Sequence, residues 1–173
     1  MSGLFIVFEG LKGAGRKTQI NLLEQALQKA GLQVASIAFP NFDAEIARLT
    51  RRGDYDAYTL ALLYAADRSQ HQQRIKTLLQ QNQVVICDRY CYSNFAFQAA
   101  QGLPLEWLQK IEENIIKPKL VVLLDLPVDA AIMRIRQANI EDFTKRELVE
   151  RLQREKEILE KVREIYLQLA RTD

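Results

Sequence analysis

Four short apolar runs, separated by segments with helical periodicity, constrain the fold of this chain more than any other feature. The runs are Leu4–Phe8, Val34–Phe39, Val84–Cys87 and Leu120–Leu124. Each is apolar at most positions instead of alternating strictly with polar residues, which is typical of parallel strands covered by helices on both faces. The sequence therefore predicts an α/β fold in which a parallel sheet is joined by right-handed crossovers and flanked by helices.

The segments between the apolar runs predict helices. Residues 16–30 place apolar side chains on one face, and Gly31 supplies a helix stop. Residues 56–80 are predicted to form one long helix. Pro104 and Pro127 are predicted as first residues of two further helices, where the missing N–H costs nothing.

A last long helix is predicted to begin at a capping box, Thr144–Glu147. No repeat or linker divides the sequence, so we expect a single domain over residues 1–173. The apolar stripe of the last helix consists of Leu148, Leu152, Leu159, Val162, Tyr166 and Leu169.

Composition excludes several functional classes. The net charge is only +2, from 24 basic and 22 acidic residues, which argues against nonspecific nucleic-acid binding. No apolar run approaches a membrane span, so we expect no membrane partner. Two cysteines, Cys87 and Cys91, predict reduced, buried thiols in a cytoplasmic protein. The single histidine, His71, is predicted at a solvated helix position and disfavours histidine-based acyl transfer and His-rich zinc sites.

A glycine-rich loop follows the first predicted strand and precedes the first predicted helix. Glycines allow close approach of phosphate oxygens to backbone N–H groups, and the helix N-terminus adds partial positive charge. The loop nearly matches the G-x-x-x-x-G-K-[ST] pattern of ATP-binding P-loops. Its candidate phosphate-binding residues are Gly10, Gly13, Ala14, Gly15, Arg16, Lys17 and Thr18.

Two interpretations of the mismatch are open. The loop contains one extra residue, so that Lys17 and Thr18 form the usual pair, or Arg16 replaces the lysine and Lys17 replaces the hydroxyl residue. The second would place an ammonium group near the position of a Mg²⁺ ion, where repulsion amounts to several kcal/mol before phosphate offsets it.

Further motifs accompany this loop: Phe8-Glu9-Gly10, Phe39-Pro40, Leu62–Arg68, Asp88–Gln98, Lys117–Leu120, Leu124-Asp125 and the helix Glu157–Ala170. Together with the loop they resemble the thymidylate kinase family. The register of Gly13, Ala14, Gly15 and Gln19 within that family favours the substitution interpretation. The family resemblance implies a three-layer P-loop NTPase-type sheet, with four strands predicted here and a fifth strand absent.

The resemblance implies a nucleoside pocket. Tyr64 matches an aromatic residue that stacks on thymine, and Arg68, on the same helix face, matches an arginine that binds the base. Ser93 and Gln98 match other lining positions. The remaining substrate-binding candidates are Glu9, Lys12, Phe39, Pro40 and Arg89.

The resemblance also implies catalytic roles. Arg89 would bind the monophosphate and span toward the transferred group, and Asp88 would help to organise Mg²⁺ and water. Arg16, in the position of the P-loop lysine, is the third catalytic candidate. Arg134 and Arg136 are candidate ATP-binding residues before a mobile lid, predicted at about residues 136–144.

Several positions depart from the family pattern. Lys12 stands where a carboxylate that holds the sugar 3′-hydroxyl is usual, and Ala38 stands where an arginine is usual. The lid stretch 137–143 contains no Arg or Lys, and the sequence ends at Asp173, before the family's fifth strand, adenine-contacting loop and last helix.

The implied function is transfer of the γ-phosphoryl group of ATP to thymidine monophosphate, with Mg²⁺, by a cytoplasmic homodimer. The altered charges favour an alternative, a degenerate kinase-like protein that binds nucleotide or a partner with little or no turnover.

Overall fold

The computed structural model describes residues 3–137, 150 and 155–172 of the chain. The predicted capping box, Leu148, Leu152 and most of the predicted lid lie outside these residues. The strands are β1 (Leu4–Glu9), β2 (Val34–Ala38), β3 (Val84–Asp88) and β4 (Leu120–Leu123). They form one parallel sheet in the order β2-β3-β1-β4, which confirms the predicted α/β fold and its four predicted strands.

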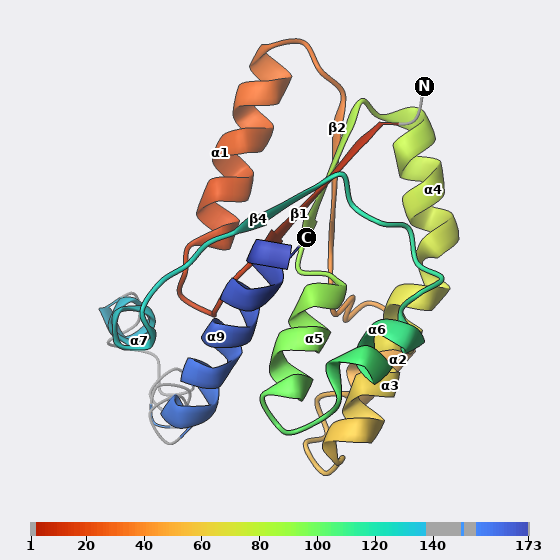
Figure 1. Ribbon diagram of the computed structural model, residues 1–173. Helices are drawn as coiled ribbons and strands as arrows, with labels where there is room; N and C mark the ends of the chain where they lie inside the picture. The colour runs from red at the N-terminus through yellow and green to blue at the C-terminus, as the bar shows by residue number, and fades with distance from the viewer. Residues whose placement is uncertain (1–2, 138–149, 151–154, 173) are drawn as a thin grey trace.

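Helices cover both faces of this sheet (Figure 1). Successive side chains of β1 point to opposite faces, as in any strand. Ile6 and Phe8 face a cluster that includes Ile20 of α1, whereas Phe5 and Val7 face the larger cluster beneath α4 and α5. The helices are α1 (Arg16–Lys29), α2 (Glu45–Leu49), α3 (Ala57–Gln70), α4 (Gln72–Gln81), α5 (Cys91–Ala99), α6 (Leu105–Ile111), α7 (Val128–Gln137) and α9 (Lys156–Thr172).

The prediction of one long helix over residues 56–80 is wrong, because the chain forms α3 and α4 with a break at His71. His71 has φ −94° and ψ 2°, and its backbone N–H donates to the carbonyl of Arg68. Its ring Nδ1 lies 2.7 Å from the carbonyl oxygen of Asp67 and its Nε2 lies 2.8 Å from Asn41 Nδ2. The prediction of a solvated His71 is therefore also wrong, because the ring holds two segments together.

The predicted bounds of α1 and the predicted starts of α6 and α7 lie within one residue of the observed ones. Gly31 follows the end of α1 with φ 80°, as expected for a helix stop. Pro104 and Pro127 each lie immediately before a helix instead of inside its first turn. Among the described helices, none has the length and apolar character required to cross a membrane.

The topology brings the carboxyl ends of β1 and β3 together. Phe8 of β1 pairs with Asp88 of β3, although the two residues are eighty positions apart in the chain. Helix α9 packs against α5 and α7, so that it lies beside the same end of the sheet (Figure 1). In parallel α/β sheets this end is where ligands bind.

Candidate active site

The glycine loop between β1 and α1 has a backbone that side chains would not tolerate. Gly10 has φ 135°, and a Cβ atom there would lie 2.5 Å from the carbonyl oxygen of Leu124. Gly13 has φ 89°, and its Cβ would lie 2.6 Å from the carbonyl oxygen of Ala131 in α7. The glycines thus permit tight packing and leave the loop backbone at the N-terminus of α1, a location suited to anions.

Arg16 is the first residue of α1 and its side chain reaches into this loop. Nη1 donates to the carbonyl oxygens of Gly10 (2.7 Å) and Leu11 (2.9 Å), and Nε donates to Oδ1 of Asp88 (2.6 Å). Lys17 and Thr18 are exposed. The guanidinium of Arg16 thus lies within the loop, and its replacement of the P-loop lysine stays a prediction.

Arg89 follows β3 in a left-handed backbone conformation. Its φ is 69°, uncommon for a residue with a side chain and costing about 1 kcal/mol or more. Its N–H donates to the carbonyl of Phe8 (2.9 Å), which fixes it to the neighbouring strand. Nη1 donates to Ser93 Oγ (2.8 Å) and to Tyr166 Oη (3.3 Å). The local structure directs the guanidinium toward the space between α5 and α9.

A cavity of about 280 Å³ adjoins Arg89 and gathers most of the predicted nucleoside-binding residues. Its size is at the lower end of the range for small-molecule sites. The predicted residues that line it are Phe39, Pro40, Tyr64, Arg68, Arg89, Ser93 and Gln98.

Sequence reasoning missed the partner of Arg68. Nε donates to both carboxylate oxygens of Glu112, at 3.0 and 2.9 Å, and Nη2 also donates to Glu112. Both side chains are almost fully buried. Burial alone lowers the pKa of Arg68, but the hydrogen bonds and charge of Glu112 outweigh it and leave that pKa raised. No motif surrounds Glu112, so only the structure reveals the pair.

Asn94 also lines the cavity and has an unusual set of partners. Its Nδ2 donates to the carbonyl of Ala61 (3.1 Å) and to Glu112 Oε1 (3.0 Å), which fixes the orientation of the amide because both partners only accept. Its Oδ1 is buried and has no hydrogen-bond partner among the described residues. A buried acceptor without a partner costs about 1–3 kcal/mol.

The segment that carries Phe39 and Pro40 is fixed by a second missed residue, Asp67. Oδ2 of Asp67 accepts from the N–H of Asn41 (2.8 Å), and its side chain is 1% exposed. His71 contacts Asn41 from the same helix turn. The wall of the cavity is therefore attached to α3.

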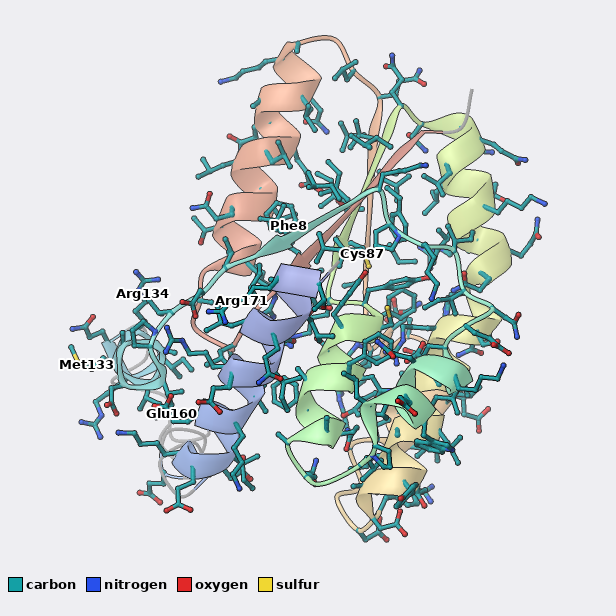
Figure 2. All side chains as sticks on the ribbon, in the orientation of Figure 1. Phe8, Cys87, Met133, Arg134, Glu160 and Arg171 are labelled. Carbon is teal, nitrogen blue, oxygen red and sulfur yellow. The ribbon has the colours of Figure 1, made fainter. Side chains whose placement is uncertain are left out.

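The structure does not bring every predicted site residue into this cavity. Glu9 is fully buried beneath Tyr90 and Ser93. Lys12 lines a separate cavity of about 270 Å³, which Arg89 also lines. Arg134 and Arg136 are exposed on α7, and Figure 2 shows Arg134 on its outer side, away from α9.

The remaining chemistry of the site is limited. Burial raises the pKa of Cys91 to about 12 and that of Cys87 well above its ordinary value, so neither thiol is a nucleophile at neutral pH. Cys87 is the residue before the carboxyl end of β3 (Figure 2).

The described residues contain no cluster of three metal-ligating side chains. Protein groups there would therefore hold a divalent ion only if the oxygens of a bound ligand supplied further contacts. Asp88 is connected to the loop through its ion pair with Arg16.

Comparison with known proteins supports the same picture. The family model for thymidylate kinase matches residues 8–173. The chain is 42% identical to a probable thymidylate kinase of Pyrococcus abyssi, over 98% of this chain and 84% of that protein. It is 41% identical to one from Pyrococcus horikoshii, with the same coverage, and 35% identical to one from Methanocaldococcus jannaschii, over 98% and 83%. The resemblance inferred from the motifs is confirmed, and the chain belongs to the thymidylate kinase family.

Proposed function

We propose that this protein is a nucleoside monophosphate kinase that transfers the γ-phosphoryl group of ATP to thymidine monophosphate. The observation that carries the proposal is the position of Arg89. It lines the nucleoside cavity, and it directly follows Asp88, which is paired with Arg16 of the glycine loop. A monophosphate at Arg89 would therefore lie beside a polyphosphate held by the loop.

The cavity suits the edge of a thymine base. Thymine presents a carbonyl acceptor at O4 and a donor at N3. Arg68 lines the cavity and would donate through Nη1, because its Nε and Nη2 already donate to Glu112. Asn94, on the cavity wall, would accept through Oδ1, which no described residue satisfies. Cytosine presents an amino donor and a bare ring nitrogen at the same positions, so both contacts would be lost. Tyr64 would offer an aromatic face for stacking.

The phosphate end would act by positioning and charge stabilisation, without a covalent intermediate. Arg89 would bind the acceptor phosphate, and Arg16 would turn from the loop carbonyls toward the transferred group. A Mg²⁺ ion would neutralise phosphate charge, held by the ATP oxygens and by Asp88, whose Oδ1 alone accepts from Arg16. Because the described residues contain no cluster of three metal-ligating side chains, such an ion would fit here only when the nucleotide supplies most of its ligands.

A coupled assay of ATP-to-ADP conversion tests the proposal. We expect turnover with thymidine monophosphate and Mg²⁺, and at least tenfold less with cytidine or deoxycytidine monophosphate. Arg89→Leu should abolish turnover, whereas Arg74→Leu, at an exposed position of α4, should not change it. Absence of turnover with every pyrimidine monophosphate would refute the proposed kinase activity.

A second candidate is nucleotide binding with little turnover. It is favoured by Lys17, which places a positive charge where a hydroxyl usually helps to hold Mg²⁺, and by the Arg16–Asp88 ion pair. The double variant Arg16→Lys with Lys17→Thr separates the two candidates. A rise in turnover of tenfold or more would show that the loop limits the natural chain. Unchanged turnover would place the limit elsewhere.

We further propose that the protein acts in the cytoplasm as a homodimer. Support comes from two exposed apolar side chains on one face of α3, Tyr58 and Leu62, which are each about half exposed. Sedimentation velocity should give a mass near twice 20.0 kDa. Leu62→Glu should shift it to the monomer, and a monomeric wild type would refute the proposal.

A further inference from the structure

A buried carboxylate lies directly beneath the candidate phosphate-binding arginine. Glu9, the last residue of β1, is 0% exposed. It accepts hydrogen bonds from the N–H groups of Tyr90 (2.7 Å) and Ser93 (3.1 Å) and from Ser93 Oγ (2.7 Å). Tyr166 Oη donates to Glu9 Oε2 at 2.9 Å. Such a buried charge is stable only because its oxygens are this fully hydrogen-bonded.

Tyr166 comes from the far end of the chain. It lies on α9, is 3% exposed, and its ring packs edge-on to Phe97 at 6.5 Å between centroids. Its hydroxyl contacts Glu9, Ser93 (3.0 Å) and Arg89 Nη1 (3.3 Å). One phenolic oxygen therefore connects the C-terminal helix with the guanidinium at the end of β3.

The direction of these hydrogen bonds follows from the chemistry of the groups. Arginine only donates and an ionised carboxylate only accepts. Tyr166 and Ser93 each have one hydroxyl hydrogen, and each donates it to Glu9. Their oxygen lone pairs then accept from Arg89 Nη1. Glu9 thus orients two neutral oxygens toward the guanidinium.

This arrangement leaves the charge of Arg89 available. Among the described residues Arg89 forms no ion pair, whereas Arg16 and Arg68 are both paired with a carboxylate. Two neutral acceptors fix the position of Nη1 without neutralising the guanidinium. A phosphate would therefore meet a guanidinium that neutral oxygens hold in place and that no described carboxylate contacts directly.

We propose that Tyr166 is a positioning residue, which places Arg89 for binding the substrate phosphate and is itself oriented by Glu9. The inference rests on the proposed function, because it assumes that Arg89 binds a nucleoside monophosphate. It predicts that loss of the Tyr166 hydroxyl weakens binding of the phosphate but not of the nucleoside.

Isothermal titration calorimetry with thymidine monophosphate and with thymidine tests this. Tyr166→Phe should raise the Kd of the monophosphate about tenfold, since a hydrogen bond to a charged group is lost, and change that of thymidine less than about twofold. Glu9→Gln should give the same pattern. Tyr55→Phe, in the segment before α3 and outside the lining of the cavity, is the matched control and should change neither.

A double-mutant cycle distinguishes positioning from a structural role. In an Arg89→Met background, Tyr166→Phe should change the Kd of the monophosphate less than about twofold. A merely structural hydroxyl would lower the melting temperature and weaken both ligands equally in either background, which would overturn the proposal. An unchanged Kd for both ligands in Tyr166→Phe would overturn it too. A wild-type chain that binds no thymidine monophosphate would instead refute the proposed function, and this inference with it.

Discussion

Replacement of Glu112 by alanine should destabilise the protein strongly. The carboxylate of Glu112 is 0% exposed and the side chain of its partner Arg68 is 3% exposed, so solvent screens neither charge. The substitution leaves the guanidinium without a counter-charge and removes an acceptor of Asn94 Nδ2. Removal of one partner from a buried pair costs about 3–5 kcal/mol. For a chain of this size each kcal/mol lowers the melting temperature by about 2–4 °C, so we expect a drop of roughly 6–20 °C.

Urea denaturation followed by circular dichroism, combined with thermal unfolding, measures this effect. The neighbouring Glu113 is the matched control, because it pairs with Lys110 on the surface, with side chains 46% and 72% exposed. Glu113→Ala should change the free energy of unfolding by less than about 0.5 kcal/mol. If Glu112→Ala costs less than about 1 kcal/mol, or no more than the control, the buried pair does not stabilise the fold as argued.

Three further predictions concern the thiols, a surface ion pair and the metal. Burial raises the pKa of Cys91 to about 12 and that of Cys87 well above its ordinary value, so at pH 8 both should resist iodoacetamide in the native protein and react after unfolding. Rapid native alkylation, read by mass spectrometry, would contradict this. Hydrogen bonds from Arg163 lower the pKa of Asp125 below its usual 3.8, so Asp125→Asn should cost less than about 0.5 kcal/mol near neutral pH, given partial exposure, and this difference should vanish as pH falls below 3.8. If the loss of unfolding free energy in Asp125→Asn instead grows as the pH falls, the prediction is wrong. Removal of Mg²⁺ with EDTA should abolish ATP-dependent turnover. It should change the Kd of thymidine monophosphate less than about twofold, because protein side chains line the cavity that would bind it. Loss of thymidine monophosphate binding in EDTA, measured by calorimetry, would show that Mg²⁺ is needed for binding as well.

The sheet could be predicted because its signal is local. Each predicted run matches an observed strand within one residue at either end, as with Leu4–Phe8 against the observed Leu4–Glu9. Strands buried on both faces need apolar residues at nearly every position, and few other segments of a chain this size show that pattern. The glycine loop could also be predicted, because a left-handed backbone conformation favours glycine over other residue types.

The missed features depend on contacts between segments that are distant in sequence. The break at His71 arises from its contacts with Asn41 and Asp67, which helical periodicity does not reveal. Glu112 resembles any charged residue of a short helix until Arg68 lies against it. Tyr166 was predicted only as part of an apolar stripe, because periodicity describes its ring and says nothing about its hydroxyl.

The hydrogen bond between Glu9 and Tyr166 joins residues 157 positions apart. During synthesis the first strand leaves the ribosome long before the helix that completes its surroundings. At typical translation rates that interval is about 10–30 seconds. Throughout it the carboxylate lacks the hydroxyl of Tyr166, so water must solvate that oxygen until α9 docks.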